Sequence, residues 1–232
     1  MQLFCFTYAG GTAAFYNDIE KICKGIIFVK LEYPGHGTRR KEALCEEFRE
    51  LARDLLEQIK TSYSGGEYCL MGYSMGSIAL FETLQLILEE NILPMPKHIF
   101  LAAHAPMKMT IIEQLSEQEL SAYVKKRTIE FGGIPKALQG NKPFWRTYLP
   151  LYETDYMMIS KYDFDELAFT TDVAVTIFYS DSDTPKADME KWKKYFRGEF
   201  EMIEYSGTHF FIYEHLEEMA EIVMKYAAKD VE

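Results

Sequence analysis

A serine between two glycines, a late histidine and two neighbouring aspartates are the residues of this sequence that could do chemistry together. Ser74 lies in GYSMG, His209 lies in YSGTHFF, and Asp181 and Asp183 lie in YSDSDTP. A serine hydroxyl becomes a useful nucleophile when a histidine accepts its proton, and a carboxylate can hold that histidine in orientation. The residue types therefore predict acyl transfer through a covalent serine intermediate, provided that the fold brings the three together.

The elements around these residues predict a parallel sheet covered by helices. Short apolar runs, typical of strands buried on both faces, alternate with helical periodicity, and this alternation predicts right-handed βαβ units. The expected strands are Leu3–Thr7, Ile26–Glu32, Tyr68–Met71, His98–Ala102, Val173–Tyr179 and Phe200–Tyr205. The expected helices are Ala13–Lys24, Leu44–Lys60, Ser77–Glu90, Asp188–Phe196 and Glu214–Ala228. We expect the strand order 2-1-3-4-5-6, because it places the loop after the first strand beside Ser74.

A long region without strand patterns lies between the fourth and fifth expected strands. Residues 116–131 and 144–162 keep helical periodicity, and Ser116 followed by Glu119 predicts a capping box at the start of the first of these helices. The sequence predicts one α/β domain over residues 1–232, with a helical insertion at about 106–171 that is a lid or a structural appendage.

The setting of Ser74 is the one that a nucleophile elbow needs. EYCLM before it is typical of a buried strand, and SIALFETLQLILEE after it is typical of a helix. A sharp strand-to-helix turn raises the serine oxygen above the sheet, and Gly72 and Gly76 leave room for the backbone. The amide of Met75 and one amide of a neighbouring loop would then face a developing oxyanion. The alternative is a small polar residue that merely fits a tight turn.

Five histidines compete as the base, and His209 is favoured because a loop after the last strand can reach the carboxyl edge of the sheet. His215 falls in an expected helix, His98 opens a strand, His36 precedes Ser74, and His104 ends the neighbouring strand, where it could line the pocket. Asp181 and Asp183 are both candidates for the acid, and their DSD run lacks the partners of a metal site. The order Ser, Asp, His is that of the α/β-hydrolases.

Composition excludes several other classes of protein. The chain has 232 residues, 48% of them hydrophobic, and a net charge of −11, which argues against a general nucleic-acid binder. No apolar run approaches the ~20 residues that span a bilayer, so no membrane association is expected. The N-terminus lacks the basic and apolar regions of a signal peptide. Four scattered cysteines (Cys5, Cys23, Cys45 and Cys69) indicate reduced thiols and a cytoplasmic protein.

Several segments in order resemble one family, the type II thioesterases that serve nonribosomal peptide and polyketide synthases. LFCFTYAGGTAAFY is similar to the family's FPYAGG segment, LEYPGHGTRRKE to PGRGxRxxE, GYSMGS to GHSMGA and GTHFF to GGHFF. The stretches FGGIPKAL and LPLYETDYMMISKY resemble pieces of the family lid. Thr7, Tyr73 and Thr208 depart from the family's proline, histidine and glycine, which could change loop stiffness or pocket polarity.

The resemblance implies hydrolysis of acyl groups from the phosphopantetheine thiol of acyl or peptidyl carrier proteins, without a metal or bound cofactor. It implies Ser74 as nucleophile, His209 as base and then acid, Asp183 as the orienting carboxylate, and the amides of Ala9 and Met75 as the oxyanion hole. Tyr8, Tyr73, Trp145 and Tyr148 are the candidate substrate-binding residues. We expect a monomer, with Lys125, Lys126 and Arg127 as the favoured docking cluster for the carrier.

Two other readings of the sequence stay open. The same triad cleaves oxygen esters, so the chain could be a carboxylesterase or small lipase. A non-catalytic protein that binds a ligand in a hydrolase pocket is the second, although the full set of Ser, His and Asp argues against it.

Overall fold

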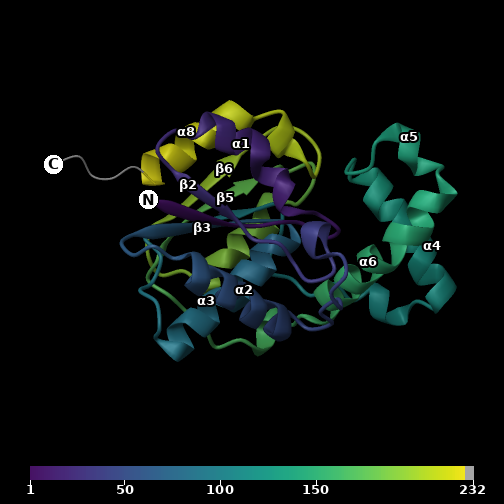
Figure 1. The fold of residues 1–232 in the computed structure, drawn as a ribbon, viewed down its shortest axis with the longest axis horizontal. Helices are drawn as coiled ribbons and strands as arrows, with labels where there is room; N and C mark the ends of the chain where they lie inside the picture. The colour runs from purple at the N-terminus through teal and green to yellow at the C-terminus, as the bar shows by residue number, and fades with distance from the viewer. Residues whose placement is uncertain (228–232) are drawn as a thin grey trace.

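Six parallel strands form one sheet, with helices on both faces (Figure 1). The computed structural model describes the backbone of residues 1–227 and the side chains of residues 1–112 and 114–227. The strand order β2-β1-β3-β4-β5-β6 confirms the expected topology. The strands are β1 (Gln2–Phe6), β2 (Ile27–Lys30), β3 (Tyr68–Tyr73), β4 (His98–Ala102), β5 (Ala174–Tyr179) and β6 (Phe200–Glu204).

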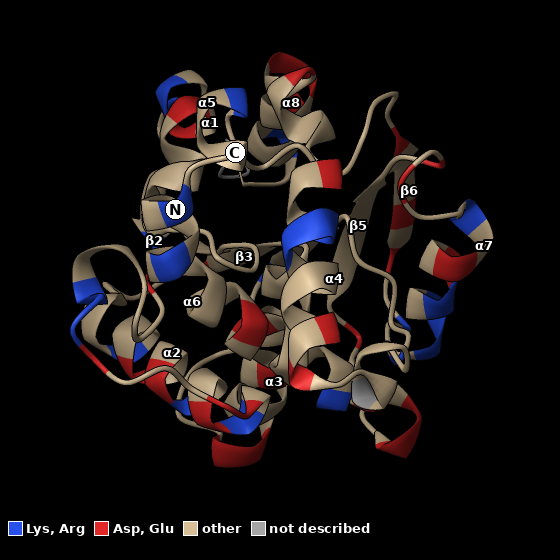
Figure 2. Ribbon diagram, turned by 90° about the vertical axis from the view of Figure 1, so that its right-hand side faces the viewer, with Lys and Arg blue, Asp and Glu red and all other residues tan. Residues whose placement is uncertain are grey.

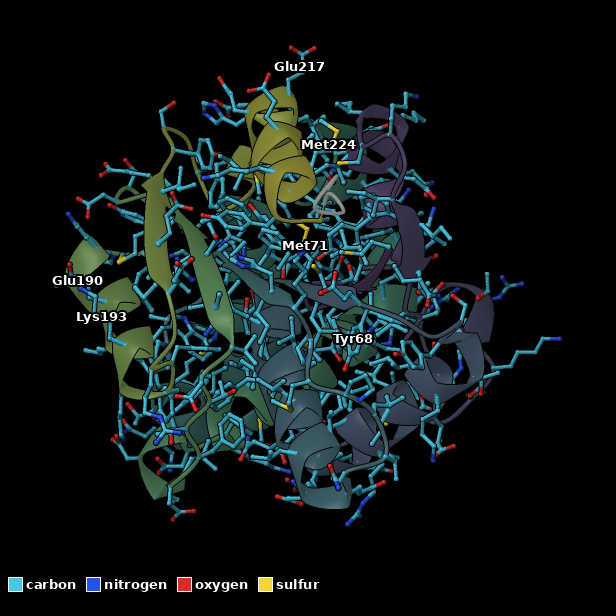
Figure 3. The ribbon with its side chains drawn as sticks, turned by 90° about the vertical axis from the view of Figure 1, so that its left-hand side faces the viewer. Tyr68, Met71, Glu190, Lys193, Glu217 and Met224 are labelled. Carbon is cyan, nitrogen blue, oxygen red and sulfur yellow. The ribbon has the colours of Figure 1, made fainter. Side chains whose placement is uncertain are left out.

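Two pairs of helices cover the two faces of the sheet (Figure 1). On one face α1 (Asn17–Ile22) packs against α8 (Leu216–Ala227), and on the other α2 (Phe48–Ser62) packs against α3 (Met75–Glu90). The side chains of β3 point alternately to the two faces of the sheet. In Figure 3, Met71 points toward α8, and Tyr68 points toward α2 and α3. No helix within residues 1–227 is long and apolar enough to cross a membrane.

Burial follows the position of each strand in the sheet. Every residue of β1, β3 and β4 is buried, as their continuous apolar sequences predict, because these strands lie inside the sheet. The edge strands are less covered: β6 is only partly buried, and Ile27 of β2 is 59% exposed. The four cysteines are buried free thiols.

Several expected helix boundaries are wrong. The segment after β1 begins as a 3-10 turn (Ala13–Tyr16) before α1, and α2 begins at Phe48 because Leu44 lies in the loop, against Gly35. The helix expected over Asp188–Phe196 is a short α7 (Lys186–Met189) followed by a 3-10 turn (Glu190–Lys194). This tighter turn accompanies full burial of Trp192, whose indole N–H donates to the His104 carbonyl at 2.8 Å. The last helix begins at Leu216, and the expected end at Ala228 lies outside the described residues.

The insertion between β4 and β5 forms a separate helical layer beyond the carboxyl ends of the strands (Figure 1). It contains α4 (Glu117–Glu130), α5 (Lys136–Gln139) and α6 (Lys142–Lys161), with short 3-10 turns at Ile112–Gln114 and Phe164–Glu166. The expected capping box is present, since the Ser116 N–H donates to Glu119 Oε2 at 2.9 Å. Val124, Trp145, Tyr152 and Tyr156 form a small core of their own in this layer, which therefore has the packing to act as a unit.

Candidate active site

Ser74 occupies a sharp turn between β3 and α3. Its backbone has φ 55° and ψ −122°, a strained conformation for a residue with a side chain, and its N–H donates to the Ala102 carbonyl of β4 at 2.8 Å. The turn is possible because two flanking residues lack side chains. A Cβ on Gly76 would lie 2.1 Å from the Phe6 carbonyl oxygen, and a Cβ on Gly72 would lie 2.5 Å from the Gly76 carbonyl oxygen. The local sequence thus raises Ser74 at the carboxyl edge of the sheet.

Three side chains from distant segments meet at this edge. The Ser74 Oγ lies 2.9 Å from His209 Nε2, and His209 Nδ1 lies 2.9 Å from Asp183 Oδ2. The side chains of His209 and Asp183 are only 7% and 6% exposed. With Nδ1–H donated to the carboxylate, the Nε2 lone pair faces the serine hydroxyl and can accept its proton. The geometry is that of a nucleophile, a base and an orienting acid.

The loops that carry the histidine and the acid are tied to the sheet and to each other. The Tyr73 hydroxyl donates to the His209 carbonyl at 2.7 Å, and the Ser180 hydroxyl donates to the Gly207 carbonyl at 2.6 Å. Asp183 is the carboxylate at the imidazole. Asp181 is exposed and accepts the Lys186 N–H at 2.8 Å, which satisfies the start of α7.

The two residues expected to form the oxyanion hole are Met75, which follows Ser74 in the chain, and Ala9, which lines the Ser74 cavity. Met75 is the first residue of α3, so its N–H has no acceptor within the helix and carries the positive end of the helix dipole. Ala9 lines the same cavity as Ser74, from the loop after β1. This loop is held on both sides of Ala9, because the Gly11 N–H donates to the Tyr8 carbonyl at 2.9 Å and the Gly10 N–H donates to Asp155 Oδ2 at 2.6 Å.

A cavity of about 310 Å³ opens at Ser74 between the sheet edge and the helical layer. Its wall from the insertion is largely apolar and includes Met109, Phe131, Tyr152, Tyr156 and Ile159. A cavity of this size and character can hold a small or medium apolar group next to Ser74.

Of the four candidate substrate-binding residues, Tyr8 alone lines this cavity in the described structure. Tyr73 is fully buried behind the His209 turn, Trp145 lies in the core of the helical layer, and Tyr148 is 47% exposed. The positions of aromatic residues in the insertion do not tell which of them line a pocket and which pack the helices, because both kinds recur at helical spacing. The cavity does not support the assignment of these three residues to substrate binding.

Phe131 and His104 line the cavity near His209 and affect its packing and its charge environment. Phe131, at the end of α4, stacks on the imidazole with ring centres 4.0 Å apart, and the Arg127 guanidinium lies 4.3 Å from the Phe131 ring centre. His104 lines the cavity, as its position at the end of β4 predicts, and burial lowers its pKa to about 4. His104 is therefore a neutral ring at neutral pH, and the cavity gains no charge from it.

The remaining histidines have structural partners. His98 Nε2 bonds the Thr176 hydroxyl at 2.9 Å, and His215 precedes α8 instead of lying within it. His215 bonds Glu218 at 2.8 Å on the surface. His36 is buried against Asp155 of α6, a contact across 119 residues of chain that no sequence spacing indicates.

A parallel sheet in this order, with a strained serine at the turn after β3, defines the chain as an α/β-hydrolase. Comparison with protein families narrows the class. The chain belongs to the thioesterase domain family, whose model matches residues 1–226. It is accordingly a hydrolase of thioesters.

Relatives with known names and structures agree with this assignment. The medium-chain S-acyl fatty acid synthase thioesterase of Homo sapiens is 26% identical over 241 residues, which cover all of this chain and 87% of that protein. The gramicidin S biosynthesis protein GrsT of Aneurinibacillus migulanus is 25% identical, over 97% of this chain and 88% of GrsT. The crystal structure of ClbQ, from the colibactin pathway of combined nonribosomal peptide and polyketide synthesis, superposes with a TM-score of 0.86 at 27% identity and covers 97% of this chain and 95% of ClbQ.

Proposed function

We propose that this chain is an editing thioesterase that hydrolyses acyl groups from the phosphopantetheine thiol of carrier proteins in nonribosomal peptide or polyketide synthesis. The similarity to GrsT and ClbQ over nearly the whole chain supports the pathway class. The contact of Ser74 Oγ with His209 Nε2 at 2.9 Å, at the mouth of an apolar cavity, is the observation that carries the proposed chemistry. We propose further that residues 1–232 act as one cytoplasmic, monomeric hydrolase domain with residues 106–171 as its lid.

In the proposed first step, Ser74 Oγ attacks the thioester carbonyl carbon while His209 Nε2 accepts the hydroxyl proton. The carbonyl oxygen becomes an oxyanion, and the amides of Met75 and Ala9 stabilise it by hydrogen bonds that strengthen as the charge develops. The C–S bond then breaks, and His209 returns its proton to the departing sulfur. The products of this step are the free pantetheine thiol and an acyl ester of Ser74.

In the second step, water attacks the acyl-enzyme along the same path. His209 removes a proton from the water, the second tetrahedral intermediate collapses, and the proton passes to Ser74 Oγ as the carboxylic acid leaves. Asp183 keeps the imidazole in the tautomer that both steps need, since it accepts the Nδ1–H at 2.9 Å. Side chains and amides of this chain perform every transfer, so we propose that no cofactor is needed.

The apolar wall of the cavity supports discrimination among acyl chains. Each methylene buried against Tyr152, Tyr156 or Ile159 contributes about 0.8 kcal/mol, so medium chains should bind more tightly than acetyl. Equal turnover of acetyl and medium-chain carriers, unchanged by substitutions in the helical layer, would argue against an acyl pocket at this place.

The deciding experiment measures hydrolysis across a panel of acylated carrier proteins with the wild type, Ser74→Ala and the control Ser64→Ala. Ser64 is an exposed serine whose hydroxyl donates to Gln2. We expect Ser74→Ala to lose nearly all turnover and Ser64→Ala to retain it. Faster cleavage of simple aryl esters than of carrier thioesters would favour a carboxylesterase. Failure of a serine-directed phosphonate to label the wild type would favour a non-catalytic binding protein.

A further inference from the structure

A buried pair of side chains joins the lid to the loop that carries Ala9. The carboxylate of Asp155, in the middle of α6, uses Oδ2 to accept the Gly10 N–H at 2.6 Å and also faces His36 Nε2 at 3.0 Å. The side chains of His36 and Asp155 are only 3% and 2% exposed. The pair is separate from the Ser74, His209 and Asp183 contacts, and the proposed steps make no use of it.

Both ring nitrogens of His36 face acceptors, an arrangement that favours the imidazolium form. Nδ1 lies 2.9 Å from the Pro34 carbonyl oxygen, and Nε2 faces the Asp155 carboxylate, so both nitrogens meet acceptors. A neutral imidazole has one N–H and would leave one of these contacts without a donor, whereas an imidazolium donates to both. Burial alone would lower the pKa of His36, but the charge and hydrogen bond of Asp155 and the Pro34 carbonyl together raise it above its ordinary value.

The phenols and the thiol around the pair stay neutral near neutral pH. Burial raises the pKa of Tyr33 well above its usual range and the pKa values of Tyr152 and Cys45 to about 12. The Glu32 carboxylate also faces His36, and it accepts the N–H groups of Ala13 and Thr38 at 2.9 and 3.1 Å. A change of the pair between pH 6 and 10 can therefore be followed as a change of His36.

The loop at Gly10 fits against α6 without spare room. Gly10 has φ +72°, and a Cβ built on it would lie 1.8 Å from the Tyr152 ring, one turn before Asp155 on the same helix. The loop backbone therefore touches the helix directly at Gly10, and the residue before Gly10 is Ala9. A hydrogen bond at the Gly10 N–H fixes the orientation of the peptide that follows Ala9, and so limits the angle at which the Ala9 amide can point.

We infer that Asp155 is a positioning residue for the oxyanion hole and that His36 holds Asp155 in place, so that α6 must be seated on the Gly10 loop for the Ala9 amide to face the oxyanion. The inference rests on the proposed hydrolysis at Ser74. It makes the lid part of the catalytic arrangement, beyond its role as a wall of the cavity.

The first test compares Asp155→Ala and Asp155→Asn with the wild type on an acyl-pantetheine thioester, with kcat expressed per phosphonate-titrated serine. Misplacement of one oxyanion donor should lower kcat by about 10- to 100-fold, while KM stays within about twofold, because the donor acts mainly on the tetrahedral state. Asn keeps an acceptor for the Gly10 N–H but loses the charge, so its loss should be smaller. Thr154→Ala, whose hydroxyl bonds only the Pro150 carbonyl of its own helix, should match the wild type.

A transition-state analogue separates positioning from simple loss of fold. An alkyl boronic acid forms a tetrahedral adduct on Ser74 with one oxygen in the oxyanion hole, so its affinity should fall in parallel with kcat across the variants. Variants with normal boronate affinity and normal kcat per titrated serine would overturn the inference. If Asp155→Ala does not fold, Asp155→Asn and His36→Gln decide the question, because both remove charge with little change in volume.

The second test uses pH. Because the pKa of folded His36 is raised, its charge supports Asp155 below that pKa, and the support is lost as the pH rises through it. His36→Gln keeps a donor toward Asp155 but cannot titrate, so the ratio of wild-type kcat to His36→Gln kcat should fall as the pH rises from 6 to 10. The surface variant His215→Gln should give a ratio that does not change with pH. A constant ratio for His36→Gln would contradict the inference.

The outcomes distinguish this inference from the proposed function. Retained turnover in Ser74→Ala would contradict both the proposed mechanism and this inference. Loss of turnover in Ser74→Ala, together with unchanged kcat and boronate affinity in Asp155→Ala and His36→Gln, would remove the inference alone.

Discussion

At the scale of single residues, the site depends on a short chain of hydrogen bonds whose members have separate tasks. Ser74 Oγ contacts Nε2 of His209, and Asp183 contacts the opposite nitrogen of the same ring. In the proposed mechanism Asp183 does not contact the substrate, and its contact with Nδ1 sets which imidazole nitrogen carries the proton. Its removal should therefore affect the rate and leave the fold intact.

We predict that Asp183→Asn lowers kcat by about 10⁴-fold, because the amide favours the imidazole tautomer that cannot accept a proton from Ser74. Asp181→Asn should stay within a few-fold of the wild type, since Asp181 only accepts the Lys186 N–H. Steady-state kinetics on one acyl-pantetheine thioester measures both variants. The reverse ranking would mean that Asp181 is the acid in the working enzyme.

At the scale of elements, α4 of the helical insertion contacts His209 through Phe131, which stacks on the imidazole. We predict that Phe131→Ala lowers kcat by about 2- to 10-fold, because stacked rings contribute about 0.5–1.5 kcal/mol and their loss frees the imidazole to move. Phe144→Ala is the matched control, since this lid aromatic packs on Trp145 and Tyr148 and does not touch His209. Equal effects of the two substitutions would show that both act through general packing of the lid.

A second prediction at this scale concerns the stability of the junction between β3 and α3. Gly76→Ala places a methyl group 2.1 Å from the Phe6 carbonyl oxygen, and the backbone of β1 cannot yield without moving the sheet. We expect it to destabilise the fold by about 3 kcal/mol, the upper end for overpacked sites, which lowers Tm by roughly 6–10 °C. Gly140→Ala, with φ −96° and no atom within 4 Å of its Cβ, should leave Tm unchanged. A normal Tm for Gly76→Ala, measured by thermal unfolding, would show that the junction relaxes more easily than its contacts indicate.

At the scale of the whole molecule, the net charge of −11 would give no general attraction to an acidic carrier protein, so the proposed docking would depend on local positive charge. One such cluster, Lys125–Arg127, lies on α4, which crosses in front of the sheet in Figure 2 and carries blue residues between red ones. Lys126 is 76% exposed, whereas Lys125 lies over the Trp145 ring and Arg127 lines the cavity. A second basic cluster, Arg39–Lys41, follows the PGHG turn, and there Arg39 forms ion pairs with Glu42 and Asp54.

We predict that combined Lys125→Glu and Lys126→Glu raises KM for an acylated carrier about 5- to 10-fold at low salt, and less at high salt, because close charge pairs are screened over about 8 Å. Hydrolysis of the free pantetheine thioester should be preserved, since it has no carrier surface to repel. The same reversal at Arg40 and Lys41 is the control and should leave KM unchanged. Equal losses on both substrates would indicate a damaged lid instead of a lost docking surface.

Local sequence is enough to predict the positions of the inner strands, the elbow at Ser74 and the start of α4, because each depends on residues close together in the chain. Apolar runs set β1, β3 and β4, Gly72 and Gly76 permit the turn, and Ser116 with Glu119 caps a helix. Helix boundaries are predicted less well from local sequence. Leu44 lies outside α2 and the helix after Pro185 is short, because tertiary contacts override local propensity at both places.

Which groups surround the Ser74 hydroxyl and the His209 imidazole depends on how distant segments pack together. From the residue types alone, Asp181 and Asp183 were equal candidates for the acid. In the structure Asp183 faces His209, and Asp181 accepts the Lys186 N–H. The contact of His36 with Asp155 joins segments 119 residues apart, and Phe131 reaches His209 from a different layer of the molecule. Such contacts depend on how helices and loops pack, and the periodicity of one segment carries no information about which distant segment will cover it.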